Sequence, residues 1–570
     1  MNGANASVPQ DFIYSPDAVD FVLRSNVYID QRIQSNPDVI ATQVLSGRYV
    51  VCYTRTETFR KTISQFGSSF ISSISLVLGL LDRASLEASG ITQVQRQPYL
   101  DLKGEGVLLG FLDTGIDYTQ SAFRRPDGTS KIQYIYDQTI ISTPPEGFLL
   151  GTEYTNEQIN QALKSENPYE VVPHRDTVGH GTFLASVAAG RDSGDLTGAA
   201  PESDLIVVKL QKASPFYRNW FSVPEEQENV YESTSVMIGV EYIIERARQM
   251  NRPVVICLGI GTTFGAHDGF TIFEEYLSGI ANLRGVCVCT AAGNESQARH
   301  HTQGTIAAKG ETQNIDLKIG ENAGNVIVGI WNTTSDKVSL SVRSPTGEMV
   351  GRVPSKPDTN VQSNLILEKS SVQIQYYFPY ESTGSQLSVV NIFNATPGIW
   401  TITVYGDIIL NGVFHAWLPL TGFVSPTVEF LSATPYYTVT CPSTMFGSIS
   451  CGAYDSTTNS LLSESSWGPT RLDRMAPDLV APGDDVVGIF PSGRGVMSGT
   501  SVAAAITAGA CALMMQWGIV KKNDAALSTY QIRAYLIRGC NRSPTMVYPN
   551  TQWGYGSLNL IESFNLMREL

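Results

Sequence analysis

Four runs of consecutive apolar residues predict a parallel-sheet domain in this chain. Both faces of a parallel strand are covered, so such a strand is apolar at nearly every position and not only at every second one. A helical pattern at residues 236–244 lies between two of these runs. Alternating strands and helices predict an α/β fold with a doubly wound parallel sheet, whose functional side chains lie at the carboxyl ends of strands. The four predicted strands are residues 106–112, 204–209, 253–257 and 285–289.

A longer apolar run follows Ser501 and continues without a charge to about Met515. It is apolar on every face, which predicts a helix buried inside a larger domain. Ser501 would stand at the helix N-terminus, where free N–H groups and the helix dipole favour a developing negative charge. A nucleophilic serine needs that setting, although small residues with a Ser or Thr cap are also common at ordinary helix starts.

Residues 1–95 have a different pattern, which predicts a small α+β unit. One clear strand covers residues 48–54, a polar helix follows it, and a second apolar run covers residues 74–81. We expect a short helix at residues 84–88 and a further strand at residues 91–95. The order strand, helix, strand, helix, strand is that of a small accessory domain.

A third pattern begins near residue 305, where apolar and polar positions alternate and Gly, Pro, Asn and Asp interrupt the strands at short intervals. This pattern predicts an all-β sandwich, jelly-roll-like, that is inserted into the α/β domain. The α/β pattern resumes at Cys441. The expected domains are the N-terminal unit, the first part of the α/β domain, the insert and the second part of the α/β domain: residues 1–95, 96–304, 305–437 and 438–570.

The charge of the chain restricts its partners. Asp and Glu number 53 against 39 Lys and Arg, the net charge is −14, and no basic cluster occurs, so we expect no nucleic-acid partner. No uninterrupted apolar run reaches the roughly 18 residues of a membrane span, so we expect no membrane partner. Residues 1–5 lack a basic and an apolar region, so we expect no secretory signal and synthesis in the cytoplasm.

The eight cysteines lie mostly in apolar runs and lack the spacing of a metal site or of a disulfide framework. We therefore expect buried, reduced thiols, no metal ion and no cofactor. The adjacent His300 and His301 offer too few ligands for zinc, so we expect a polar loop there. Aromatic pairs in the insert favour packing, although carbohydrate binding by the insert stays open.

Four polar residues stand where the α/β pattern places functional side chains. Asp113 and Asn294 each follow a predicted strand, and His180 and Ser501 each begin a predicted helix. A serine hydroxyl attacks a carbonyl when a base takes its proton. We expect Ser501 to be the nucleophile and His180 the base, while Asp113 holds the imidazole tautomer and offsets its charge. Asn294 and the Ser501 backbone N–H would donate hydrogen bonds to the oxyanion.

Short motifs surround these residues in a fixed order: Asp113-Thr114-Gly115, His180-Gly181-Thr182, Ala291-Ala292-Gly293-Asn294, Ser466-Trp467-Gly468-Pro469, residues 477–483 and Gly499-Thr500-Ser501-Val502-Ala503. Together they resemble the subtilisin-like serine proteases (subtilases) over residues 106–304 and 438–570. The resemblance implies a subtilisin-like fold and endopeptidase activity on protein substrates. Two positions depart from the family pattern. Ala505 replaces a usual proline, and the substrate-lining strand reads Gly259-Ile260-Gly261, so we expect a widened wall of the S1 pocket at Gly259.

Further segments resemble the Csp germination proteases of clostridial spore-formers: residues 97–102, Asp117-Tyr118, residues 136–139, residues 151–154 and residues 265–269. This resemblance implies an N-terminal prodomain, a subtilase core and a jelly-roll insert. It also implies association with the spore and activation of a protein zymogen, a spore cortex-lytic enzyme precursor, by limited proteolysis during germination. The group includes pseudoproteases, but Asp113, His180 and Ser501 are all present in this chain.

Two other functions stay open, a general degradative subtilase and a non-catalytic scaffold or signal-sensing partner. The resemblance further implies that residues 1–95 are a prodomain, which the active site cuts in cis and which then stays bound. We expect the cut after Gln95 or Arg96, or alternatively near residues 81–90. A cut after Gln97 is disfavoured, because Pro98 would have to supply the leaving amine.

Overall fold

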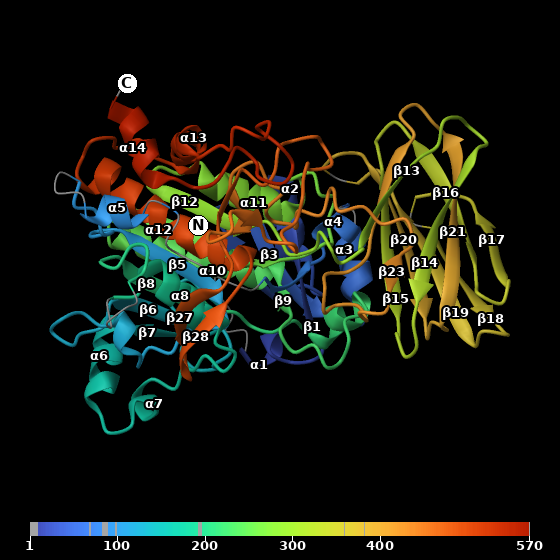
Figure 1. Ribbon diagram of the computed structural model, residues 1–570. Helices are drawn as coiled ribbons and strands as arrows, with labels where there is room; N and C mark the ends of the chain where they lie inside the picture. The colour runs from blue at the N-terminus through green and yellow to red at the C-terminus, as the bar shows by residue number, and fades with distance from the viewer. Residues whose placement is uncertain are drawn as a thin grey trace.

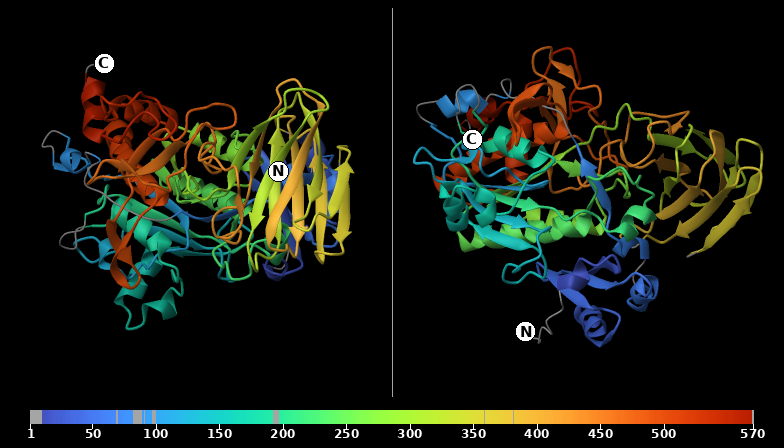
Figure 2. Two further views of the ribbon diagram at one scale, coloured as in Figure 1. Left: turned by 45° about the vertical axis from the view of Figure 1, so that its right-hand side comes forward. Right: turned by 90° about the horizontal axis from the view of Figure 1, so that it is seen from below.

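The computed structural model describes residues 10–568, except residues 68–69, 82–88, 90, 97–99, 192–196, 358 and 381. They form an α/β domain, a β-sandwich at one end of it and a small N-terminal unit (Figure 1). The right-hand view of Figure 2 shows the N-terminal unit, in blue, on one side of the α/β domain and the sandwich, in yellow, at its end.

The α/β domain is built on a nine-stranded sheet in which most neighbouring strands run parallel. β5 (Leu108–Asp113) lies between β8 (Asp204–Lys209) and β10 (Val254–Leu258). The chain first builds the β8 side and then crosses to β10, so the carboxyl end of β5 lies at the switch point where such sheets bind ligands. The predicted doubly wound parallel sheet is confirmed. The other strands are β6 (Ile132–Asp137), β7 (Thr152–Thr155), β12 (Val286–Ala291), β24 (Ile449–Asp455), β25 (Ser460–Leu461) and β26 (Leu479–Pro482).

Helices cover both faces of this sheet, with α8 (His180–Ala189) and α12 (Thr500–Met515) on one face and α10 (Ser233–Gln249) and α11 (Ile272–Ala281) on the other. Alternate side chains of β5 pack on the two faces of the sheet. Leu109 and Phe111 belong to the core around α12, whereas Leu108 and Leu112 belong to the core around α10. The segment 500–520 is long and apolar enough to cross a membrane, but 89% of its apolar window is buried inside the molecule. It is the central helix of this core.

Shorter elements complete the α/β domain: η2 (Ser121–Phe123), α5 (Ile91–Arg96), α6 (Asn156–Lys164), α7 (Pro168–Val171), α9 (Pro215–Trp220), the hairpin β27 (Val486–Phe490) and β28 (Gly493–Met497), η3 (Gln516–Val520), α13 (Thr529–Gly539) and α14 (Leu560–Arg568). The strand predicted at residues 91–95 is wrong, since this segment is the helix α5. Its apolar residues Ile91 and Val94 are both buried, and their spacing is that of one face of a helix.

The N-terminal unit contains the antiparallel sheet β1 (Ala18–Arg24), β3 (Tyr49–Arg55) and β2 (Ala41–Leu45), in that order, with the helices α1 (Gln10–Ile13), α2 (Val27–Ser35), α3 (Phe59–Gln65) and α4 (Phe70–Ser73). The predicted strand at residues 48–54 corresponds to β3. The sequence did not predict β1, because the buried Asp20 interrupts its apolar run. The helix predicted at residues 84–88 lies outside the described residues.

The last strand before this gap, β4 (Val77–Leu80), leaves the N-terminal sheet. It pairs antiparallel with two short strands of the α/β domain, β9 (Tyr231–Glu232) on one side and β11 (Ile260–Gly261) on the other. The N-terminal unit thus contributes the central strand of a three-stranded sheet to the α/β domain.

The predicted all-β insert is confirmed as a sandwich of two antiparallel sheets around its own core. The six-stranded sheet contains β13 (His301–Thr305), β22 (Val413–Trp417), β15 (Val326–Asn332), β20 (Gln386–Phe393), β19 (Ser370–Tyr377) and β18 (Asn360–Leu365). The five-stranded sheet contains β17 (Met349–Val353), β16 (Lys337–Arg343), β21 (Gly398–Ile408), β14 (Thr312–Ile319) and β23 (Glu429–Phe430).

Candidate active site

Three of the predicted site residues meet at the ends of three elements. Asp113 is the last residue of β5, His180 is the first of α8 and Ser501 is the second of α12. His180 Nδ1 lies 2.7 and 2.8 Å from the two carboxylate oxygens of Asp113, and His180 Nε2 lies 3.4 Å from Ser501 Oγ. All three side chains are buried. This is the order of groups in which a carboxylate orients an imidazole and the imidazole takes a proton from a hydroxyl.

Several groups that were not predicted from the sequence hold His180 in place. The Asp176 carboxylate accepts hydrogen bonds from the backbone N–H groups of Gly179 (2.7 Å) and Thr182 (3.0 Å) at the start of α8. Burial raises the pKa of Asp176, but hydrogen bonds from Thr182 and Gly179 more than offset this effect and lower its pKa overall. An ionised Asp176 therefore stabilises the helix N-terminus that carries His180. Asp176 precedes His180 by four residues, a spacing that could have suggested this role.

Gly181 lets α8 approach β5. A Cβ atom at this position would lie 2.2 Å from the Gly115 carbonyl oxygen and 3.0 Å from Asp113 Cβ. The Gly181 N–H also donates to Thr114 Oγ1 (3.0 Å), and the Thr114 N–H donates to the Asp113 carboxylate (2.7 Å). The glycine of the His-Gly-Thr motif and the threonine of the Asp-Thr-Gly motif thus fix the distance between the base and the carboxylate.

Asn294 lies just beyond β12, beside the start of α12. Its Oδ1 accepts hydrogen bonds from the backbone N–H (3.2 Å) and the hydroxyl (3.0 Å) of Thr500. This contact fixes the orientation of the amide, so its NH₂ group is the end that can donate to an oxyanion. The Thr500 hydroxyl also accepts a hydrogen bond from the Gly293 N–H (3.1 Å). Thr500, which precedes Ser501, is therefore hydrogen-bonded both to Asn294 and to the residue that precedes Asn294.

The strand β4 lies against this site as an extended peptide. The Ser501 backbone N–H donates a hydrogen bond to the carbonyl oxygen of Leu81 (2.9 Å), the residue that follows β4. The Leu81 N–H donates in turn to the Gly259 carbonyl (3.2 Å). Ile260 pairs with Leu80, and Gly261 pairs with Gly79. The Leu81 carbonyl therefore occupies the position at which a scissile carbonyl would meet a nucleophile and an oxyanion donor.

The alternative location for the cut, at the start of residues 81–90, is the one that the geometry brings to Ser501. Gln95 instead lies on α5, where its side-chain amide donates to the carbonyls of Gly198 (3.0 Å) and Ala199 (2.8 Å). Arg96 is the last residue of the same helix. A helix cannot enter a protease cleft as an extended strand, which disfavours cleavage after either residue.

Gly259 does not widen the wall of the S1 pocket, contrary to the prediction from the sequence. A Cβ atom there would lie 2.6 Å from Leu184 Cδ1 and 3.2 Å from Ser501 Cβ, so the space is already filled by Leu184 and faces the nucleophile. Gly261 is the residue that lies against the Leu81 side chain, because a Cβ at Gly261 would be 3.1 Å from Leu81 Cδ1. The absent side chain at Gly261, and not that at Gly259, therefore leaves space for the Leu81 side chain.

The three neighbouring histidines are buried, so the polar loop expected at His300 and His301 is wrong. His300 Nδ1 contacts the Glu295 carboxylate at 3.1 Å, and His301 Nε2 lies 3.1 Å from His415 Nδ1. Burial, with the neighbouring His415 as a further cause, lowers the pKa of His301 well below its usual range. The three rings pack where the sandwich joins the α/β domain, and burial also lowers the pKa of His415.

Three thiols meet behind the site, a grouping that sequence spacing did not predict. Cys287 and Cys289 lie on one face of β12 and Cys511 lies on α12, and their sulfur atoms are all within 4.8 Å of one another. All three are fully buried. In the described part of the chain, this is the one group of such residues close enough to hold a metal ion. Buried cysteines of this kind also pack as small apolar residues between a strand and a helix.

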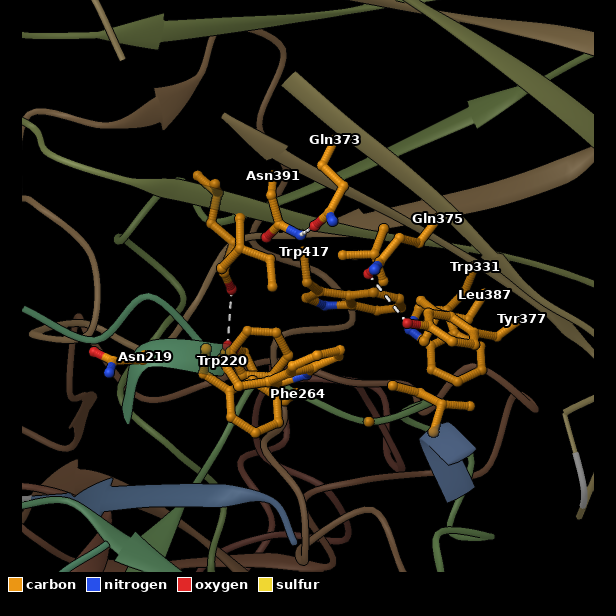
Figure 3. Close-up of a pocket in the computed structure, with 18 of the residues that line it drawn as sticks. Asn219, Trp220, Phe264, Trp331, Gln373, Gln375, Tyr377, Leu387, Asn391 and Trp417 are labelled. Atoms are coloured by element: carbon orange, nitrogen blue, oxygen red, sulfur yellow. Dashed lines mark hydrogen bonds between the residues drawn. The ribbon is translucent and has the colours of Figure 1, made fainter. Parts of the chain in front are cut away.

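A cavity of about 340 Å³ lies at the junction of the sandwich, α9 and α4, away from the triad (Figure 3). Trp220, Phe264, Trp331 and Trp417 form much of its wall, and none of the described residues that line it carries a charge. Because these residues include no carboxylate, histidine, lysine, serine or cysteine, the cavity does not compete as the active site with the triad of Asp113, His180 and Ser501.

The fold and this site define a serine endopeptidase. The subtilase family model matches residues 104–383 and 430–556, so the chain belongs to the subtilase family. It is similar to the solved structure of the Clostridium perfringens CspB protease, with 32% identity over 85% of this chain and 98% of that chain and a TM-score of 0.74. The predicted resemblance to Csp-type subtilases is confirmed.

Other solved structures are less similar to the chain. They include the prenylagaramide maturation protease PagA, with 13% identity, 84% and 98% coverage and a TM-score of 0.41. A cold adapted subtilisin-like serine proteinase has 14% identity, 83% and 98% coverage and a TM-score of 0.39. No curated protein matches the chain.

Proposed function

We propose that this protease cuts its own N-terminal unit between Leu81 and Asp82, keeps the cut unit bound, and activates a protein zymogen by limited proteolysis. The observation that carries the proposal is the hydrogen bond from the Ser501 N–H to the Leu81 carbonyl oxygen, 2.9 Å long. An enzyme whose own chain occupies the cleft in this way is arranged to cut that chain first.

In the proposed reaction, Ser501 Oγ attacks the Leu81 carbonyl carbon while His180 Nε2 takes the hydroxyl proton. The Asp113 carboxylate stabilises the imidazolium. The Ser501 N–H and the Asn294 side chain stabilise the oxyanion. His180 then gives the proton to the nitrogen of Asp82, which leaves, and water hydrolyses the acyl-enzyme. Cleavage leaves β4 paired with β9 and β11, which supports a prodomain that remains bound.

The substrate part of the proposal rests on the similarity to a Csp-type protease and on the occupied cleft. We infer a spore-associated enzyme that cuts a spore cortex-lytic enzyme precursor during germination. A general degradative subtilase is less well supported, because β4 fills the cleft that bulk substrates would need. A non-catalytic scaffold is disfavoured by the intact arrangement of Asp113, His180 and Ser501.

Mass spectrometry and N-terminal sequencing of purified wild type and Ser501→Ala test the self-cleavage. Wild type should yield one chain that ends at Leu81 and another that begins at Asp82, whereas Ser501→Ala should remain one chain. A wild type that is never cut yet hydrolyses protein substrates would refute the proposal, and a new N-terminus at Arg96 or Gln97 would move the site to the first prediction. Conversion of a cortex-lytic precursor to a single product, without degradation of casein, would support limited proteolysis.

A further inference from the structure

Gly79 is the third residue on the N-terminal side of the peptide bond after Leu81, whose carbonyl oxygen contacts Ser501. We use the usual names for these positions: P1 for Leu81, P2 for Leu80, P3 for Gly79 and P4 for Leu78. A Cβ atom on Gly79 would lie 2.8 Å from Leu420 Cδ2 and 3.1 Å from Phe423 Cε1. Both residues belong to the insert, between β22 and β23. Two side chains of the insert therefore cover the P3 position.

Successive side chains of β4 point to opposite sides, which agrees with the position of Leu420 and Phe423 over Gly79. Leu78 packs into the core around α10, while Leu81 packs into the core that also contains Leu420 and Phe423. The P1 and P3 positions thus face the same side, as successive odd positions of a strand must. Leu78 is fully buried, whereas Leu80 is only partly buried. The cleft encloses P4, P3 and P1 more completely than P2.

The cover over Gly79 has little freedom to move. Leu420 and Phe423 are only 2% and 1% exposed. The Phe423 N–H donates to the Leu420 carbonyl (2.7 Å), so the two residues form one tight turn. Within that turn, the Thr421 N–H donates to the carboxylate of Glu295 (3.2 Å), the residue after Asn294. The turn is therefore fastened to the catalytic site itself.

We infer that the insert makes this protease selective for glycine at P3, in its own chain and in any protein segment it cuts, with leucine at P1 and an apolar residue at P4. The inference rests on the proposed self-cleavage after Leu81. Its substrate class is an extended segment with the pattern Leu-Gly-x-Leu before the cut. An alanine at P3 must displace Leu420, and a branched residue must displace both side chains. Overpacking of this kind in a rigid site reduces the rate by about 10-fold to 200-fold.

Self-cleavage of the full chain tests the inference. Gly79→Val should slow the appearance of the new N-terminus at Asp82 by at least about tenfold, and Gly79→Ala should have a smaller effect. Adding Leu420→Ala to Gly79→Val should restore much of the rate, because it removes the atom nearest to the new side chain. Gly351→Val is the matched control, since Gly351 also lies in a strand but has no atom within 4 Å of the place where its Cβ would lie.

The outcomes separate the inference from the proposed function. If wild type is not cut, or is cut equally in Ser501→Ala, the self-cleavage proposal fails. If wild type is cut but Gly79→Val is cut as fast, selectivity at P3 is refuted. If Gly79→Val is not cut and Leu420→Ala gives no recovery, the cover is not the cause and the inference is also overturned.

Discussion

Asp20 and Glu232 form a buried carboxyl pair where the N-terminal unit meets the catalytic domain. Asp20 lies in β1 and Glu232 in β9, and they are 6% and 7% exposed. Asp20 Oδ2 accepts a hydrogen bond from Thr234 Oγ1 (2.5 Å). Burial, and then the charge of Glu232, raises the pKa of Asp20 well above its usual range, and burial raises the pKa of Glu232. Tyr53 and Lys212 line the same small cavity.

The raised pKa values make the folded chain bind a proton that the unfolded chain releases. The stability from this proton is complete below the unfolded-state pKa of about 4 and is lost as the pH rises through the raised folded-state pKa. Between these two values, the free energy of unfolding falls by about 1.4 kcal/mol per pH unit for one proton. Asp20→Asn removes one of the two titrating groups, so this part of the slope should disappear.

Thermal unfolding of Ser501→Ala and of Ser501→Ala with Asp20→Asn, from pH 5 to pH 8, measures this contribution without interference from cleavage. The free energies of unfolding of the two proteins should differ least at pH 5, the lowest pH measured. The double variant that carries Asp20→Asn should then become the more stable one as the pH rises, by up to about 3 kcal/mol over two pH units. Parallel profiles, or a difference that grows toward acid pH, would contradict the reasoning.

Three further predictions concern the site and the insert. A fluorophosphonate should label wild type at Ser501 and fail on Ser501→Ala and His180→Ala, because nucleophile or base is missing; equal labelling of wild type and Ser501→Ala would exclude the assignment. Asn294→Ala should slow self-cleavage by about 10²–10³-fold while the melting temperature stays close to that of wild type, and an unchanged rate would remove Asn294 from the oxyanion site. Deletion of residues 305–437 should lower the melting temperature or the solubility, because it uncovers the apolar walls around Phe264 and Trp220. Unchanged stability with loss of one substrate would instead make recognition the main role of the insert.

The sequence predicted best those residues that both stand at the end of a strand or the start of a helix and supply the catalytic groups. Asp113, His180, Asn294 and Ser501 each stand at the end of a strand or the start of a helix, so local patterns were sufficient to predict that they meet. The N-terminal unit was predicted less well. Asp20 interrupts the apolar run of β1. The residue with which it is buried, Glu232, is more than two hundred residues away in the sequence, so no local pattern contains that contact. The position of Leu81 at Ser501 also depends on tertiary pairing of β4 with β9 and β11. The cover over Gly79 depends on packing between three separate parts of the chain.

The central position of β4 has a consequence for the solution behaviour of the protease. Removing β4 from its three-stranded sheet would leave β9 and β11 as two facing edges with unpaired backbone N–H and C=O groups. Such edges accept any extended chain, including one from another molecule. A protease freed from its N-terminal unit would therefore be prone to self-association and to cleavage by its own copies. Retention of the cut unit would thus protect the colloidal stability of the enzyme until a substrate strand takes its place.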